Sequence, residues 1–436
     1  MLKLQQLKEP MAKAHGMQYL KIGDRMLKIT IGDIPVLQSD DKKIVCFPKE
    51  KMEAIKIGIF GLTGSGKTMA GNAILGRLYH YWNISCNVFN DYLDETKSWA
   101  LRNTDFEREL RVLNETPFPL PIAHVYPQNR DTEVTCGLKV PHIRETVSFS
   151  KIVECLERYI ELKPNTLKYL LTIREDLKKC ENFEELEEQI SQIGSGKKGV
   201  NVEGSKFAML SALDDLKKEG YVDIVANNMK FEYSGTPSSM IKIKSREGTE
   251  EGTIFSMLMK YGYIPSLQTS NLLHLRYAEP YLVDKLRDIF EYPRMYKKNC
   301  VTYIPEMKLL MKYPQVVKEI ENITARGRLR GVGLIYDTQH YTSIKKEIIT
   351  NTLYALAFNQ KEATANQIKK DFDLNERDKT QIINLKKHQC LAICSSGESW
   401  SVYDLKTGEK SMVSGCFRGY PIYPLSSHKK GKSNVL

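Results

Sequence analysis

The sequence has no apolar run of the roughly 18 residues that a membrane-spanning helix needs. Its first residues, Met1 to Met11, include charged side chains and a proline, and they contain no apolar stretch long enough for a signal peptide. We therefore expect a protein without a membrane span that works in the cytoplasm.

A cysteine pattern for disulfides or zinc is also lacking. The nine cysteines are scattered, and an odd number in a chain without a secretion signal favours reduced thiols. The nearest approach to a metal cluster is His388, Cys390 and Cys394. Because Leu-Ala-Ile lies between the two cysteines, as in a buried strand, we interpret them as core residues rather than zinc ligands.

Acidic residues are outnumbered by basic ones. The chain has 64 Lys and Arg against 53 Asp and Glu, a net charge of +11, and a pI near 9.0. This balance favours an anionic partner such as nucleic acid, although many basic proteins bind none. The 436 residues, 42% of them hydrophobic, are enough for a sizeable core and for more than one domain.

The most informative motif is Gly-Leu-Thr-Gly-Ser-Gly-Lys-Thr at Gly61 to Thr68, the G-x-x-x-x-G-K-[ST] phosphate loop. An apolar run before it predicts a strand, and Met69 to Tyr79 predicts a helix. Backbone N–H groups of such a loop point at a phosphate, where the helix dipole favours an anion. We predict that Lys67 contacts the β- and γ-phosphates of ATP and that Thr68 ligates Mg²⁺. The predicted nucleotide-binding residues are Gly61, Leu62, Thr63, Gly64, Ser65, Gly66, Lys67, Thr68 and Met69.

Two later strands end in polar side chains suited to hydrolysis. The strand Cys300 to Ile304 is followed by Pro305 and Glu306, where an NTPase carries its acidic pair, so Glu306 could polarise the attacking water. A surface glutamate would look the same. A second strand, Val332 to Tyr336, leads to Gln339, which could sense the γ-phosphate or orient the water.

Arginines at alternate positions, Arg326, Arg328 and Arg330, precede the second of these strands. They could reach a neighbouring subunit's nucleotide as an arginine finger, bind DNA phosphates, or be solvated. The sequence pattern leaves these three roles open.

Alternating strands and helices after a phosphate loop predict an α/β fold with a mostly parallel sheet covered on both faces. Apolar periodicity predicts helices in an insertion, with one face formed by Ile152, Cys155, Leu156, Tyr159 and Ile160 and another by Phe183, Leu186, Ile190 and Ile193. Further predicted elements are a hairpin around Gly23-Asp24, a strand from Ile84 to Asn90 that ends at Asp91, a strand from Asn271 to Leu275, a helix from Pro280 to Phe290, and antiparallel edge strands at Cys390 to Cys394 and Trp400 to Tyr403. The expected parts are a small N-terminal β element (1–50), the first half of the nucleotide-binding core (51–147), the helical insertion (148–230), the second half of the core (231–415) and a basic flexible tail (416–436).

The order of these motifs resembles the HerA/FtsK superfamily of DNA-pumping ATPases over about residues 50 to 415. The resemblance is carried by the phosphate loop, the strand ending in Asp91, the helical insertion, Asn271 to Arg276, Tyr303-Ile-Pro-Glu306, Arg326-Gly-Arg328, Gly333 to Gln339, and Ile382 to Ile393.

The resemblance implies a RecA-like (ASCE) P-loop NTPase core and a hexameric ring that threads double-stranded DNA through a basic pore. It also implies that Lys67 and Thr68 bind nucleotide and Mg²⁺, that Glu306 activates water, and that Gln339 is the sensor. Arg326 or Arg328 would then act on the nucleotide of a neighbouring subunit.

Two departures from the family pattern affect this interpretation. Pro305 stands where the family usually has an Asp that holds the Mg²⁺ water shell, and Asp337 or Asp91 could compensate. The N-terminal element, about 50 residues, is shorter than the barrel of many HerA proteins, so we do not expect pairing with a nuclease through such a barrel. No partner nuclease or capsid can be read from the sequence. Alternative functions are an ATP-binding assembly factor with weak hydrolysis, suggested by Pro305, and a P-loop kinase with Arg326 to Arg330 as a lid.

Overall fold

The structure is a computed structural model. It describes residues 18–22, 25–29, 33–127 except 94, 102 and 114, then 142–145, parts of 170–180, 183–192, 202–218, 232–233, 254–270, 272–273 and 278–427. The predicted helical face from Ile152 to Ile160 lies outside these residues.

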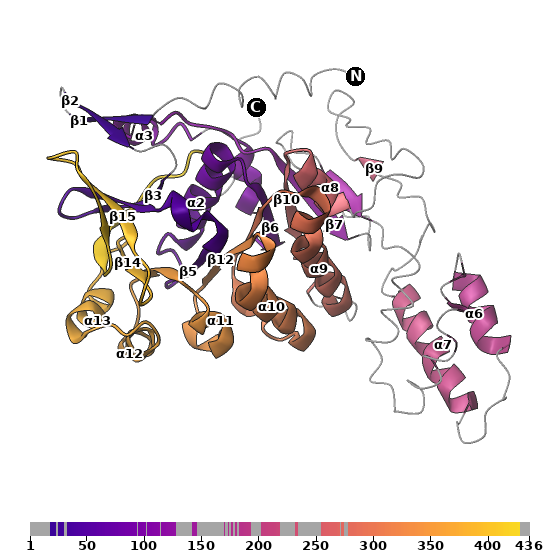
Figure 1. Ribbon diagram of the computed structural model, residues 1–436. Coiled ribbons are helices and arrows are strands. Elements are labelled where there is room, and N and C mark those ends of the chain that lie inside the picture. The colour runs from indigo at the N-terminus through magenta and orange to yellow at the C-terminus, as the bar shows by residue number, and fades with distance from the viewer. Residues whose placement is uncertain are drawn as a thin grey trace, which may run out of the picture.

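The described part is built around a 15-stranded mixed sheet (Figure 1). Its central strands are parallel, and those of their side chains that the structure describes are almost all buried, as expected for strands covered on both faces. In spatial order these strands are β13 (Tyr354–Phe358), β5 (Lys56–Phe60), β12 (Val332–Thr338), β11 (Cys300–Ile304), β6 (Ser85–Asp91), β10 (Ile264–Gln268), β7 (Ile122–Pro127) and β8 (His142–Glu145).

Helices cover both faces of the sheet and form two separate apolar cores. The helix α2 (Lys67–Trp82) follows β5 and packs in one core. The other core contains side chains from α8 (Ile254–Lys260), α9 (Ala278–Tyr296), α10 (Pro314–Arg330), α11 (Lys346–Thr350) and α12 (Glu362–Asp371). The α/β fold predicted from the sequence is therefore confirmed. None of the described helices is long and apolar enough to cross a bilayer.

The strand order places β12 between β5 and β11. Because these strands are parallel, the phosphate loop after β5, Gln339 after β12 and Glu306 after β11 leave the sheet at the same edge. Ligands bind at this carboxyl edge in open α/β sheets.

Antiparallel strands from the two ends of the chain extend the sheet beyond β13. They are, in order, β14 (Cys390–Cys394), β17 (Phe417–Pro421), β3 (Ile34–Ser39), β4 (Lys43–Phe47), β15 (Trp400–Asp404) and β16 (Lys410–Val413). The N-terminal strands β3 and β4 thus lie between C-terminal strands, whereas we expected a separate N-terminal element. The predicted strands β14 and β15 are antiparallel to their neighbours, but they lie inside the sheet rather than at its edge.

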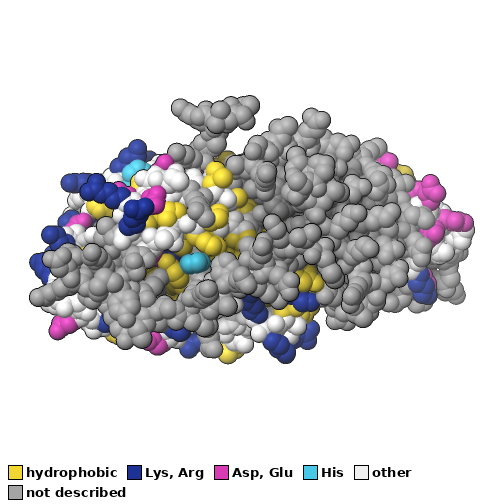
Figure 2. Space-filling model, turned by 90° about the horizontal axis from the view of Figure 1, so that it is seen from above, with side chains coloured by type: hydrophobic (Ala, Val, Ile, Leu, Met, Phe, Trp, Pro, Cys, Tyr) yellow, Lys and Arg dark blue, Asp and Glu magenta, His cyan; other side chains and the backbone are white. Residues whose placement is uncertain are grey.

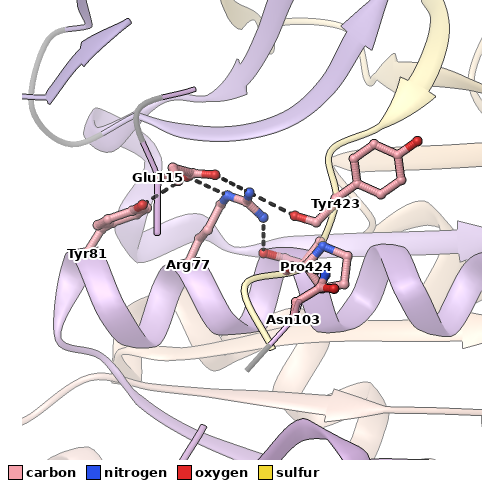
Figure 3. Close-up of polar contacts among 7 residues, drawn as sticks. Arg77, Tyr81, Asn103, Glu115, Tyr423 and Pro424 are labelled. Atoms are coloured by element: carbon pink, nitrogen blue, oxygen red, sulfur yellow. Dashed lines mark hydrogen bonds and ion pairs between the residues drawn. The ribbon is translucent and has the colours of Figure 1, made fainter. Parts of the chain in front are cut away.

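We predicted a flexible tail from residue 416 onward, but residues 416–427 are folded. They contain β17 and a buried segment that crosses α2. Figure 3 shows how this segment is held: Arg77 of α2 donates to the carbonyl of Tyr423 over 2.9 Å, and Asn103 donates to the carbonyl of Pro424 over 2.7 Å. Arg77 is also paired with Glu115, and both side chains are buried. The apolar side chains of Ile422 and Leu425 explain why this part of the chain folds.

Smaller elements complete the fold. The predicted hairpin is formed by β1 (Gln18–Ile22) and β2 (Arg25–Ile29), which pair antiparallel. In the insertion, α6 (Phe183–Gln192) and α7 (Val202–Lys218) form a pair set apart from the sheet (Figure 1). The remaining short elements are η1 (Lys49–Ala54), η2 (Glu95–Ala100), α3 (Glu107–Val112), β9 (Glu232–Tyr233), η4 (Met307–Leu310), η5 (Tyr341–Ser343) and α13 (Glu376–Ile383).

One predicted strand is wrong. The strand lies at Ile264–Gln268, whereas the backbone N–H groups of Leu272 and Leu273 both donate to the carbonyl of Thr269 in a turn. The two leucines are buried, so their apolar character reflects burial of a turn rather than pairing in a sheet.

Candidate nucleotide-binding and hydrolysis site

The phosphate loop joins β5 to α2 through a conformation that requires glycine. Gly64 and Gly66 have φ of 73° and 108°, where side chains are disfavoured. A Cβ on Gly66 would also lie 3.3 Å from Nδ1 of His388 and 3.5 Å from the ring of Phe358. The glycine positions of the motif therefore match the backbone that a phosphate cradle needs.

Polar groups in this loop fit an anionic ligand. The buried Lys67 side chain donates from Nζ to the carbonyl of Leu62 over 3.2 Å. The buried hydroxyl of Ser65 has no hydrogen-bond partner among the residues that the structure describes. Thr68 is half-buried in the first turn of α2. The N-terminus of α2, with the unpaired Ser65 hydroxyl and the Lys67 ammonium beside it, suits a phosphate group.

Hydrogen bonds join the phosphate loop to the two strand tips. The Thr63 hydroxyl donates to Oε1 of Gln339 over 2.5 Å, and Nε2 of Gln339 donates to Oε1 of Glu306 over 2.5 Å. Gln339 can make both contacts because β12 lies between β5 and β11. The residues that the sequence analysis assigned to water activation and sensing are therefore in contact beside the phosphate loop.

Asp337 is hydrogen-bonded to the backbone of Glu306, the last member of this hydrogen-bonded series. Its Oδ1 accepts from the backbone N–H of Glu306 over 3.0 Å, and its Oδ2 accepts from the hydroxyl of Tyr303. Burial raises the pKa of Asp337 to about 7, although the positive charge of Lys67 and the Tyr303 hydroxyl oppose the shift. Asp337 is also in register with Ile59 of β5, the strand that leads into the phosphate loop.

The other candidate for compensation, Asp91, is engaged elsewhere. It lies at the end of β6, which β11 and β12 separate from β5. Its carboxylate accepts from the backbone N–H of Glu95 over 2.9 Å and from Nε2 of Gln268 over 2.9 Å. Asp91 therefore stabilises the start of η2 and the neighbouring strand β10. Pro305, in turn, accepts through its carbonyl from Nδ2 of Asn90 over 2.8 Å.

The arginines lie at the opposite edge of the sheet from the phosphate loop. Arg326, Arg328 and Arg330 occupy the exposed end of α10, which terminates at Gly331, directly before β12 begins. Burial and the charge of Arg328 lower the pKa of Lys56, the first residue of β5. The helix end therefore lies near the start of the phosphate-loop strand and does not form a lid over the loop of the same chain.

No protein-family model and no curated protein matches the sequence. Among solved structures, the chain is similar to VirB4 of Thermoanaerobacter pseudethanolicus, with a TM-score of 0.50 and 12% sequence identity over 89% of this chain and 97% of that chain. The protein has the fold of VirB4. The fold expected from the resemblance to the HerA/FtsK superfamily is thereby confirmed.

Two further solved structures are similar to this chain at lower TM-scores. The bacterial conjugative coupling protein TrwB has a TM-score of 0.47 at 10% identity, over 92% of this chain and 99% of that chain. The genome packaging NTPase B204 from Sulfolobus turreted icosahedral virus 2 has a TM-score of 0.26 at 17% identity, over 32% of this chain and 65% of that chain.

The fold also places at the site two residues to which the sequence analysis gave no role there. His388 precedes β14 and brings Nδ1 to 3.2 Å from the carbonyl of Ser65, while its backbone has a φ of 65°. Tyr303 contacts Asp337 from within β11. The sequence analysis gave neither residue a role at the site, because His388 is far from the phosphate loop along the chain, and Tyr303, although it lies in the Tyr303-Ile-Pro-Glu306 segment, has the pattern of one more apolar position in a buried strand. Cys390 and Cys394 are buried in β14, in agreement with their interpretation as core residues.

Proposed function

We propose that the protein is an ATPase that binds ATP and Mg²⁺ at Gly61 to Met69 and couples hydrolysis to the movement of double-stranded DNA in the cytoplasm. The observation that carries the enzymatic part is the hydrogen-bonded series Thr63, Gln339 and Glu306. It brings a carboxylate and an amide next to a loop built for phosphate.

The residues present fit the nucleotide and its metal. Lys67 would neutralise charge on the β- and γ-phosphates, and the Thr68 hydroxyl would bind Mg²⁺. When bound, Mg²⁺ would offset the charge that develops on the phosphates. We assign to Asp337 the role of the carboxylate that is missing at Pro305, because it is buried on the strand next to β5, in register with Ile59, and already contacts Glu306.

In this proposal the protein supplies the base and its orientation. Glu306 accepts a proton from the attacking water, and Gln339 keeps the Glu306 carboxylate oriented by donating to one of its oxygens. Thr63 fixes the Gln339 amide by donating to its oxygen. A movement of the phosphate loop on ATP binding would then shift the Glu306 carboxylate through these two hydrogen bonds.

The position of the arginines supports an oligomer. They lie at the edge opposite the loop of their own chain, so Arg326 or Arg328 can act on a nucleotide only in another copy. Such a head-to-tail contact uses two different surfaces and generates a ring when the rotation closes. By the resemblance to DNA-pumping ATPases, we propose a hexamer.

The DNA substrate is supported by the same resemblance and by charge. The net charge is +11, and lysine and arginine side chains gather over the end of the molecule that holds β14 and β15, on the face that Figure 2 shows. Binding of phosphates by these residues should weaken as salt is raised.

The test is to measure phosphate release by the purified protein with and without duplex DNA, together with its size in the presence of ATP. DNA should increase the rate, and ATP should favour an oligomer. Lys67→Ala should lose ATP binding, and Glu306→Gln should keep ATP binding while turnover falls by a factor of about 10² to 10⁴. A protein that stays monomeric and whose ATPase rate ignores duplex DNA would contradict the proposal.

A second candidate function is an ATP-binding assembly factor with weak hydrolysis, which Pro305 favours because it removes a carboxylate from the tip of β11. In that case Glu306→Gln should hardly change the slow turnover. The kinase alternative loses its main support, because the end of α10 cannot close over the phosphate loop of its own chain.

A further inference from the structure

We propose that Tyr303 is a positioning residue for hydrolysis, which acts through Asp337 to hold Glu306 in place. The inference rests on the proposed ATPase function and adds a residue to which the sequence motifs assign no role. It would explain how the site keeps its base oriented although Pro305 occupies the usual position of a carboxylate.

The first step is the conformation of Glu306. Its backbone has a φ of 46°, in the left-handed region that side chains rarely adopt. Such a conformation persists only where the surrounding structure holds it. Two hydrogen bonds hold it: the backbone N–H of Glu306 donates to Oδ1 of Asp337 over 3.0 Å, and the carbonyl of Glu306 accepts from the backbone N–H of Leu309 over 2.9 Å, and of the two only the first involves a side chain.

The second step is the orientation of Asp337. Its other oxygen, Oδ2, accepts from the hydroxyl of Tyr303, which lies on the neighbouring strand β11. Without this donor the buried carboxylate could rotate, and the hydrogen bond to Glu306 would lose its alignment. The Tyr303 hydroxyl therefore fixes the plane of the group that fixes Glu306.

The third step is the rigidity of Tyr303 itself. Its ring is stacked on Trp99, with centroids 6.0 Å apart and planes at 20°. On another side it packs against Gly71 of α2, where a Cβ would lie 2.5 Å from Cζ of the tyrosine. The absence of a side chain at Gly71 lets the tyrosine pass the phosphate-loop helix and reach Asp337. The hydroxyl therefore has little freedom to point elsewhere.

The test compares Tyr303→Phe with the matched control Tyr336→Phe. Both tyrosines are buried on adjacent strands, but the hydroxyl of Tyr336 bonds to Thr352 over 2.7 Å, away from Glu306. In the full-length protein, Tyr303→Phe should lower kcat about tenfold or more, because it removes a hydrogen bond to a carboxylate. The affinity for a nonhydrolysable ATP analogue should stay within about twofold of wild type. Tyr336→Phe should leave both quantities close to wild type.

A double-mutant cycle separates positioning from a general structural effect. If Tyr303 acts only through Glu306, adding Tyr303→Phe to Glu306→Gln should change the residual rate less than about twofold. Equal kcat for Tyr303→Phe and Tyr336→Phe would overturn the inference and leave the ATPase proposal intact. A matching loss of analogue affinity would also overturn it, because the tyrosine would then support the phosphate loop. A wild-type protein that hydrolyses no ATP overturns both proposals.

Discussion

The buried pair of Arg77 and Glu115 offers a sharp test of how the C-terminal segment is held on the phosphate-loop helix. The side chains are 0% and 1% exposed, and Nε and Nη2 of Arg77 donate to the two carboxylate oxygens over 2.9 and 2.5 Å (Figure 3). We predict that Glu115→Ala destabilises the protein by about 3 to 5 kcal/mol, because it leaves a guanidinium buried without its counter-charge.

The magnitude follows from what remains around Arg77. After the change, the guanidinium keeps two acceptors among the residues that the structure describes, the carbonyls of Ala73 and Tyr423 at 3.0 and 2.9 Å, and neither carries a negative charge. The hydroxyl of Tyr81 also loses one acceptor, Oε1 of Glu115 at 2.9 Å. Replacing both charged partners, with Arg77→Met and Glu115→Leu together, removes the unpaired charge, so the double variant should be more stable than Glu115→Ala alone.

Urea unfolding followed by circular dichroism measures these differences as shifts of the midpoint at constant slope. The matched control is Glu107→Ala, which breaks the exposed pair of Arg111 and Glu107, with side chains 72% and 43% exposed. It should cost less than about 1 kcal/mol. The reasoning is refuted if Glu115→Ala costs no more than Glu107→Ala, or if the double variant is less stable than the single one.

Three further predictions follow from other parts of the structure. Asp337→Ala should abolish most ATP turnover, and adding Pro305→Asp should restore part of it if the two positions can supply the same carboxylate; phosphate release by the two variants checks this. Leu329→Glu, at a leucine that is 89% exposed between two arginines, should weaken assembly, which light scattering at several protein concentrations measures, without changing the folding of the monomer. Asp33→Asn should flatten the acid-induced loss of stability: burial alone would raise its pKa, but the donors Tyr403, Lys410 and Lys49 lower it below 3.8. The ionised Asp33 carboxylate therefore contributes fully to the free energy of unfolding above its unfolded-state pKa, and this contribution disappears as pH falls through the lower folded-state pKa. The unfolding midpoints of Asp33→Asn and wild type, measured between pH 7 and pH 3, should differ at neutral pH and converge at the acid end.

Local patterns were enough to predict the elements around the site. The loop at Gly61 to Thr68 and the strand Cys300–Ile304 carry their signals in consecutive residues, and the structure has them where the sequence analysis put them. Pairing between distant segments left no such signal. The location of β3 and β4 between β15 and β17 depends on contacts between the two ends of the chain, which alternation of apolar residues within one strand cannot specify.

The same distinction applies to the site. Glu306 and Gln339 could be singled out because each follows an apolar strand, whereas His388 reaches the phosphate loop only through folding of the chain. The arginines are a third case. The sequence analysis identified them as candidates, but it could not predict at which edge of the sheet they lie. Because α10 runs antiparallel to the strands, its last turn lies at the edge far from the loop, and this direction follows from the packing of the helix rather than from the arginines themselves.

The substitution of Pro305 also looks different once the strand order is known. Judged from β11 alone, the proline removes the carboxylate that would serve the metal. However, β12 lies between β11 and the phosphate-loop strand, and Asp337 pairs across the ladder with Ile59, close to the start of the loop. A carboxylate on β12 is therefore one strand closer to Lys67 than a carboxylate on β11 would be. Its buried location, its bond to Glu306 and its bond to Tyr303 would then be the features that compensate for the proline.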